Sequence, residues 1–117
     1  MDPAFRFICA TYVRPGREKE FEDFVKDVVE PVVRKAQPEL ADKWTMLRPA
    51  SHAPDGVEAP YVFLLSGDVP LDQWEIRPMF EAVHGSQRAN ELDRQFEGYL
   101  AREQLVYAVG EDVLGSS

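Results

Sequence analysis

The chain has 117 residues, which is enough for one domain that buries a single core without disulfides or a structural metal. Its 21 acidic residues outnumber its 13 basic residues, and the net charge of −8 disfavours binding to nucleic acid. We find neither a signal-peptide pattern nor the apolar run of about 18 residues that a membrane helix needs, so we expect no membrane contact and a cytoplasmic location. The single cysteine, Cys9, cannot form an internal disulfide and is expected to be a small buried side chain.

The first predicted strand covers Phe5 to Val13, a segment rich in β-branched and aromatic side chains. The turn residues Arg14-Pro15-Gly16 end this strand and open a helix that begins with acidic residues. Apolar residues recur in the helix at spacings of three and four, which predicts one buried stripe made of Phe21, Phe24, Val25, Val28, Val29, Val32 and Val33. Pro31 removes a backbone amide, so we expect a kink or an early end of the helix there.

Two further strands follow this helix. Lys43 to Arg48 is predicted as the second strand, and Pro49 ends it. The Pro, Gly, Asp and Ser content of residues 50–60 predicts a loop, after which Tyr61 to Leu65 is predicted as the third strand.

A long helical region is predicted after Pro70. Its apolar residues form two sets on either side of Gly85, namely Leu71, Trp74, Met79, Phe80 and Val83, then Ala89, Leu92, Phe96, Tyr99 and Leu100. Pro78 and Gly85 predict two or three helical pieces rather than one rod. The last strand is expected near Gln104 to Val109, and residues 110–117 are expected to form a flexible tail.

The predicted order of elements is β-α-β-β-α-β within a single domain that spans residues 1–117. This order is that of the ferredoxin-like α+β fold, in which a four-stranded antiparallel sheet carries both helices on one face. None of the strands alternates cleanly between apolar and polar residues, so both faces of the sheet are predicted to be apolar. About ten apolar side chains left in water would forfeit roughly 1.5–3 kcal/mol each, which exceeds the stability of a typical domain. We therefore predict an obligate homodimer whose two sheets pack face to face.

Two segments resemble a known family. The segment from Phe7 to Phe21 is a strand followed by Pro-Gly and an acidic amphipathic helix, and in Phe80 to Ser86 a histidine is followed at short distance by a serine. Both are similar to segments of the dimeric α/β-barrel superfamily, and within it of the antibiotic-biosynthesis-monooxygenase group. The chain departs from that group after the third strand, where Ser66-Gly67-Asp68 stands in place of an acidic residue and a tryptophan. Haem-degrading relatives pair a helix histidine with an asparagine of the first strand, which this chain lacks.

Histidine is the residue type in which a general acid or base is sought first, because its ordinary pKa lies near neutral pH. His84 comes one residue before Gly85 and close to Val83 and Phe80, so we expect it near the apolar interior and take it as the candidate catalytic residue. The alternative is a partly solvated histidine at a helix C-terminus, a position that the helix dipole favours. His52 is expected to be a solvated loop residue. Two distant histidines without a third ligand predict no metal site.

Aromatic and hydroxyl side chains interrupt the apolar strands and predict a pocket for a planar organic ligand, its candidates being Tyr12, Trp44, Thr45, Tyr61, Ser66 and Tyr107. Each of these side chains could equally bond a nearby backbone group or lie at a rim. Arg48 and Arg77 are candidates for orienting a carboxylate or an enolate, or else are surface charges. The predicted substrate-binding residues are Trp44, Tyr61, Tyr12 and Arg48.

The function predicted from the sequence rests partly on absent motifs and partly on the resemblance. There is no Ser-His-Asp signature, nucleophile elbow, Gly-rich phosphate loop or HExxH motif, which argues against hydrolase, kinase and nicotinamide-dependent chemistry. The resemblance implies a monooxygenase that needs no metal, flavin or haem and oxidises an aromatic or polyketide-like substrate. In that scheme His84 removes an acidic proton or holds the resulting anion, and the electron-rich substrate itself reduces oxygen. A cyclase or isomerase of the same superfamily, or a non-catalytic ligand-binding dimer, stays open as an alternative.

Overall fold

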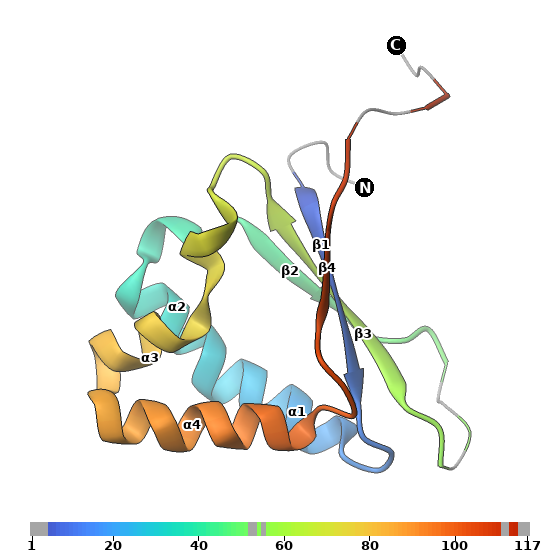
Figure 1. Cartoon of the computed structure of the whole chain (residues 1–117), viewed down its shortest axis with the longest axis horizontal. Coiled ribbons are helices and arrows are strands. Elements are labelled where there is room, and N and C mark those ends of the chain that lie inside the picture. Colours follow the sequence, from blue (N-terminus) through green and yellow to red (C-terminus); the bar gives the residue numbers. More distant parts are fainter. Residues whose placement is uncertain (1–4, 52–53, 55, 111–112, 115–117) are drawn as a thin grey trace.

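A computed structural model describes residues 5–51, 54, 56–110 and 113–114 of the protein (Figure 1). Four strands form one antiparallel sheet in the order β2-β3-β1-β4, where β1 is Phe5–Val13, β2 is Trp44–Leu47, β3 is Ala59–Ser66 and β4 is Leu105–Ala108. Helices separate β1 from β2 and β3 from β4, so the element order is the predicted one. The predicted fold class, a ferredoxin-like α+β domain with a four-stranded antiparallel sheet, is confirmed.

The first helical run continues through Pro31. It consists of α1 (Glu18–Phe24), the π-helical turn η1 (Val25–Val29) and α2 (Glu30–Ala36). Pro31 lies in the first turn of α2, where a missing amide is tolerated, and the wide turn of η1 directly precedes it. The early end expected at Pro31 is therefore wrong. The helix widens into a π turn just before Pro31 and then continues as α-helix to Ala36.

The second helical region is broken into pieces, as predicted. The 3₁₀ turn η3 (Leu71–Trp74) leads into α3 (Ile76–His84), and α4 (Ser86–Tyr99) follows after Gly85. Gly85 has φ +84° and ψ 167°, a conformation that only glycine adopts readily, and it separates the two helices. Pro78 does not break α3, because it lies in the first turn.

The remaining differences from the prediction are at element ends. The third strand starts at Ala59, two residues before the predicted start at Tyr61, and a short 3₁₀ turn, η2 (Pro38–Leu40), precedes β2. The predicted loop at 50–60 and the predicted flexible tail at 110–117 fall partly on residues outside the described ones.

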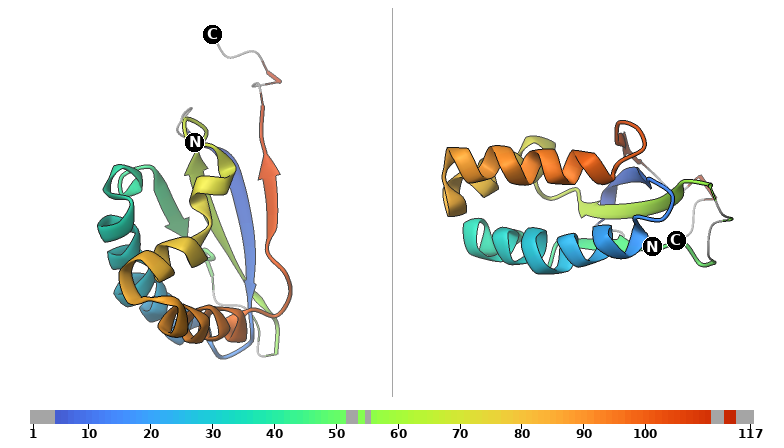
Figure 2. Two further views of the ribbon diagram at one scale, coloured as in Figure 1. Left: turned by 60° about the vertical axis from the view of Figure 1, so that its left-hand side comes forward. Right: turned by 90° about the horizontal axis from the view of Figure 1, so that it is seen from below.

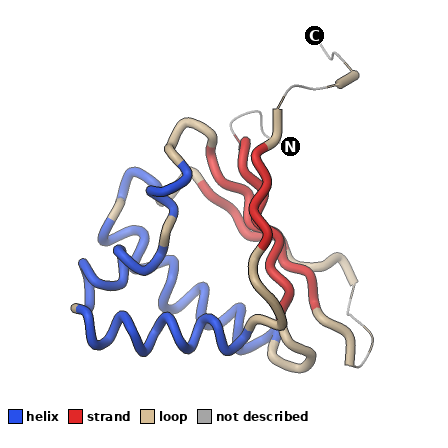
Figure 3. Tube along the Cα trace, in the orientation of Figure 1, coloured by secondary structure: helices blue, strands red, loops and turns tan. Residues whose placement is uncertain are grey.

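All helices lie on one face of the sheet, so the described chain has two layers (Figures 2 and 3). The strand side chains that point toward the helices are the buried ones, such as Cys9, Thr11 and Val13 of β1 and Tyr61 and Phe63 of β3. Their partners in the core come from the apolar stripes of the helices, including Phe21, Phe24, Phe80 and Leu92. The periodicity of the sequence thus identified the helix stripes correctly.

No helix among the described residues covers the opposite face of the sheet (Figure 2). Because directly paired residues of an antiparallel sheet share a face, two rows cross this face from edge to edge. The rows are Thr45, Leu64, Ile8 and Tyr107, then Leu47, Val62, Ala10 and Leu105. Seven of these eight side chains are apolar or aromatic, and Leu47, Leu105 and Tyr107 are 49%, 42% and 54% exposed. We call these eight residues the bare face.

The break at Gly85 gives the first testable prediction. Gly85→Ala should destabilise the fold by about 1–3 kcal/mol, because a β-carbon strains the backbone at this φ and ψ although no atom lies within 4 Å of its position. Gly98→Ala is the matched control, since it adds the same methyl group to the last turn of α4, again with no atom within 4 Å. It should stabilise the protein by up to about 1 kcal/mol. Urea denaturation measures both, and equal effects of the two substitutions would contradict the helix break.

Candidate functional site

An apolar cavity of about 610 Å³ lies between the sheet and the helices, a volume suited to a small organic ligand. Its floor consists of side chains from the helix-facing side of the sheet, including Cys9, Phe63 and Val106, and its wall includes Val25 and Val29 of η1. On the far side the segment η3 and the start of α3 close it. We refer to this space as the apolar cavity.

Four aromatic side chains line the apolar cavity, namely Trp44, Phe63, Trp74 and Phe96. The rings of Trp44 and Phe63 are stacked, with centroids 6.1 Å apart and planes inclined by 25°. Trp44 stands at the start of β2 and pairs with Leu65 of β3, so the sheet register fixes its position. Aromatic faces held in this way can bind a flat ring system at little conformational cost.

The floor of the apolar cavity carries a small polar network. The amide Nε2 of Gln104 donates to Thr11 Oγ1 at 2.8 Å, and Thr11 Oγ1 is 3.7 Å from Cys9 Sγ. Burial raises the pKa of Cys9 more than the hydrogen bond to Thr11 lowers it, so the thiol stays protonated. Cys9 is therefore a poor nucleophile, and the network serves to fix the Gln104 amide at the edge of the cavity.

The polar rim of the apolar cavity lies on the segment between β3 and α3. Asp72 and Glu75 contribute carboxylates there, and both residues are exposed. Between them Trp74 lines the cavity, and its indole Nε1 is buried without a hydrogen-bond partner in the described part of the chain. No Lys, Arg or His is among the described residues that line this cavity.

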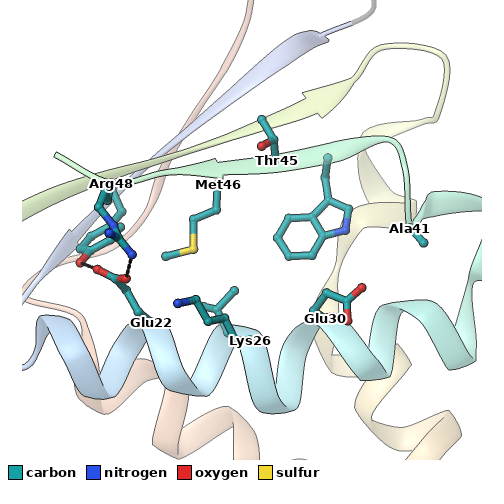
Figure 4. Close-up of a pocket in the computed structure, with 10 residues that line it drawn as sticks. Glu22, Lys26, Glu30, Ala41, Thr45, Met46 and Arg48 are labelled. Atoms are coloured by element: carbon teal, nitrogen blue, oxygen red, sulfur yellow. Dashed lines mark hydrogen bonds and ion pairs between the residues drawn. The ribbon is translucent and has the colours of Figure 1, made fainter. Parts of the chain in front are cut away.

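A second cavity of about 430 Å³ lies between the first helical run and β2. Its lining includes the charged residues Glu22, Lys26, Glu30 and Arg48, and we call it the polar groove (Figure 4). It shares Val25 and Trp44 with the apolar cavity, so these two side chains separate the two spaces. Lys26 and Glu30 of the helix and Met46 of β2 point into it (Figure 4). A third cavity, of about 980 Å³, borders the polar groove, and its lining includes Pro49, Ala50, Ser51, Pro54, Gly56 and Val57.

Glu22 joins three elements at one end of the polar groove. Its carboxylate accepts a hydrogen bond from Tyr61 Oη at 2.5 Å and one from Arg48 Nη2 at 2.5 Å (Figure 4). Partial burial raises the pKa of Glu22, but the hydrogen bonds from Tyr61 and Arg48 and the charges of Arg48 and Lys26 outweigh it, so the pKa is lowered overall. Burial and the bonded Glu22 carboxylate raise the pKa of Tyr61, which stays a protonated donor. The three side chains therefore clamp α1 to the sheet.

The structure brings three of the predicted site residues together, since Trp44, Tyr61 and Arg48 all line the polar groove. Tyr12 is not with them. It pairs with Pro60 on the face of the sheet opposite to the helices, and the Arg102 guanidinium lies 4.2 Å from its ring centroid.

His84, the histidine in the described part of the chain, is not brought to a cavity. His84 lies in the last turn of α3, is exposed and is not among the residues that line the three cavities. The expectation that its side chain lies near the apolar interior is therefore wrong, and its surroundings are those of the alternative, a solvated helix C-terminus. Arg77 pairs with Glu81 and Asp93 at 3.3 Å each. His52 lies outside the described residues.

Sequence reasoning missed the rim residues Asp72, Trp74 and Glu75 and the floor residue Gln104. The run Asp72-Gln73-Trp74-Glu75 has no motif that indicates a site. The one available signal was Trp74, a large aromatic beside two carboxylates just before a predicted helix.

The described structure also bears on metal binding and membrane insertion. In the described residues no group of three or more His, Cys, Asp or Glu side chains is placed to hold a metal ion. None of the described helices is both long and apolar enough to span a bilayer.

No protein-family model and no curated protein matches the chain. Its fold is similar to that of a monooxygenase from the gene ActVA-Orf6 of Streptomyces coelicolor, solved in complex with Nanaomycin D, with a TM-score of 0.51 and 14% identity over 98% of this chain and 96% of that one. It is also similar to an EthD family protein from Bacillus halodurans, with a TM-score of 0.50 and 14% identity over 93% and 99% of the two chains. At these identities the likeness shows the fold alone, and the fold is the ferredoxin-like one that the resemblance implied.

The Glu22 clamp gives a prediction about pH. Because the folded-state pKa of Glu22 lies below its ordinary value of 4.5, the clamp contributes stability above that pH and loses it as the pH falls through the lowered pKa. Glu22→Gln should therefore lower stability at pH 7 and show a smaller further loss on acidification than the wild type. Urea denaturation from pH 7 to pH 3 measures this, with Glu39→Gln, an exposed carboxyl on η2, as the matched control. Parallel curves for wild type and Glu22→Gln would contradict the clamp.

Proposed function

We propose that the protein is a cofactor-independent monooxygenase that oxidises an aromatic or polyketide-like substrate bound in the apolar cavity. The observation that carries the proposal is the cavity itself, about 610 Å³ in volume and walled by four aromatic side chains. A flat hydrophobic molecule gains most from such walls, while the few polar groups at floor and rim orient it. The fold shared with a monooxygenase that was solved with a small organic ligand supports the same class of function by analogy.

The proposed reaction needs a substrate with an acidic proton next to an electron-rich ring system. A base removes the proton, the anion reduces molecular oxygen, and a carbon–oxygen bond forms. For anthrone, a three-ring ketone with an acidic methylene group, the balance is anthrone plus O₂ giving anthraquinone plus water. The methylene carbon loses four electrons and the two oxygen atoms gain them. The protein contributes an apolar cavity, ring orientation and a proton acceptor.

The roles predicted from the sequence for the ring-binding residues and for the acid/base enter this proposal as follows. Trp44 lines the apolar cavity and the polar groove, and we propose it as a ring-binding residue, with Tyr61 and Arg48 at the far end of the groove. The role of His84 as the acid/base stays a prediction. Tyr12 is given no part in substrate binding, because it lies on the other face of the sheet.

A non-catalytic ligand-binding protein is the second candidate. It is favoured by one observation, that the histidine expected to act as the base does not line the apolar cavity. A cyclase or isomerase would use the same cavity and proton acceptor without oxygen. These alternatives differ in what they do to a bound aromatic ligand, so one assay separates them.

We also propose that the protein works as a homodimer in the cytoplasm, with the bare faces of two sheets packed together. Leaving seven apolar or aromatic side chains of the bare face in water costs free energy, and a second copy of the same face is self-complementary in the closed symmetry that homodimers most often have.

The function is tested with anthrone and an oxygen electrode. The protein, dialysed against a chelator, should consume about one O₂ for each anthraquinone formed and should need no added metal, flavin or haem. Boiled protein corrects for the slow spontaneous oxidation. Conversion of anthrone to its enol tautomer under argon, with no anthraquinone formed there or in air beyond the boiled control, would move the protein to the isomerase class, and binding without turnover would support the ligand binder.

The dimer is tested by sedimentation at low micromolar concentration. The wild type should have about twice the chain mass, and its melting temperature should rise with protein concentration. Ala10→Lys places a charge in the middle of the bare face and should give a monomer or an unfolded chain, whereas Gln87→Lys on the exposed side of α4 should leave the dimer intact. A folded wild-type monomer at these concentrations would rule the dimer out.

A further inference from the structure

We propose that Glu75 is the proton acceptor of the apolar cavity, and that its ligand is a neutral, weakly acidic aromatic compound, a phenol or an enolisable ketone, rather than a carboxylate or phosphate. This inference rests on the proposed function, because it takes the apolar cavity as the ligand site. It goes further by naming the group that receives the proton and the charge state of the ligand.

The charge of the lining selects the ligand. Asp72 and Glu75 are the carboxylates at the rim, and the described lining residues include no Lys, Arg or His to neutralise them. They lie one turn apart, with the amide nitrogen of Glu75 3.4 Å from the carbonyl oxygen of Asp72. An anionic ligand would meet two like charges as it displaces water, and like-charge contacts of this kind cost several kcal/mol. A neutral ligand meets no such barrier.

The carboxylate of Glu75 is not used by the fold. Glu75 is the N-cap residue of α3, where a carboxylate often bonds the amides of the first turn, yet its side chain makes no capping hydrogen bond. The ion pairs seen in the described structure engage other carboxylates, among them those of Glu22, Glu30 and Glu58. Glu75 is therefore a lining residue of the cavity whose side chain no ion pair or capping hydrogen bond holds in the described structure.

Ligand binding removes water from the surroundings of Glu75. In the free protein this side chain is exposed. A hydrophobic ligand that covers the rim displaces the water there and brings its acidic proton to the carboxylate. The O–H or C–H bond of the ligand then breaks, its electron pair stays on the ligand as a phenolate or enolate, and the proton forms an O–H bond on Glu75.

Trp74 directly precedes Glu75 and lines the same cavity. Its indole Nε1 is buried and has no hydrogen-bond partner in the described structure, so a ligand in the cavity contacts the ring rather than this N–H. The ring of Trp74 therefore offers an aromatic contact beside Glu75.

The binding test uses the two tryptophans of the chain, which both line the apolar cavity, so quenching of their fluorescence reports its occupation. The probes are 2-naphthol, neutral at pH 7, and 2-naphthoate, which has the same rings and a negative charge. Wild type should bind the naphthol at least about tenfold more tightly. The double variant Asp72→Asn, Glu75→Gln should reduce this ratio about tenfold by binding naphthoate better, whereas Glu39→Gln should leave the ratio unchanged. An unchanged ratio in the double variant would overturn the charge selection.

The catalytic test uses anthrone turnover as a function of pH. Glu75→Gln should lower kcat by about 10²–10⁴ while 2-naphthol binding stays within a few-fold of wild type, and the decline of activity at acid pH should disappear. His84→Ala is measured in parallel. A comparable loss in His84→Ala with wild-type turnover in Glu75→Gln would overturn the role of Glu75 and assign the proton to His84.

The two failures can be told apart. If wild type binds no naphthol and consumes no anthrone, the proposed function fails and this inference fails with it. If wild type binds and oxidises these probes but Glu75→Gln behaves as wild type in rate and pH profile, the proposed function stands and only the role of Glu75 is lost.

Discussion

The aromatic contact of Phe21 with the sheet holds the two layers together. Because this contact lies at one end of the sheet, space for a cavity is left at the other end. Phe21 is fully buried, and its ring packs 5.3 Å from Tyr61, 5.9 Å from Phe96 and 6.1 Å from Tyr99, centroid to centroid. These contacts join α1, α4 and β3 at one end of the sheet. Away from this end the helices lean outward from the strands (Figure 1), and the apolar cavity lies in the space that results. Packing that is tight at one end therefore produces an opening at the other.

The leaning of the helices away from the sheet also determines which polar groups lie near the proposed ligand site. At the closely packed end, near Phe21, the Glu22 carboxylate accepts hydrogen bonds from Tyr61 and Arg48. These bonds join the helix layer to the sheet and leave Glu22 unavailable to a ligand. At the open end the chain crosses from β3 to α3 through η3, and the carboxylates of Asp72 and Glu75 stay in contact with water until something replaces it. Reactive carboxylates belong at such a place, because the energy of desolvating them comes from ligand binding rather than from folding.

The sequence was informative where one periodic signal decides the outcome. The strand Phe5–Val13 has the predicted bounds, and the helix stripe around Phe21 is buried, because alternation and helical spacing depend only on local geometry. Tyr12 pairs with Pro60 and shares its face of the sheet, whereas Tyr61 lies on the opposite face. Predicting this separation requires the pairing register of β1 and β3, which the composition of the strands does not contain. The rim at η3 and the exposure of His84 depend on how far the helices lean from the sheet, a property of the whole core.

The register of β1 against β3 thus controls two surfaces at once. A slip of one residue would exchange Cys9 and Thr11 on the helix-facing side of β1 for Ala10 and Tyr12, and Cys9 would leave the cavity floor for the bare face. The pairing shifts once, between Phe5 and Phe7, and there Gly67 faces Arg6 so closely that any β-carbon would collide with the Arg6 side chain. A glycine at this position lets Arg6 pass while Arg6 bonds the Gly110 carbonyl beyond β4. The proposed ligand site on one face and the proposed dimer surface on the other therefore depend on the same few pairings of β1 with β3.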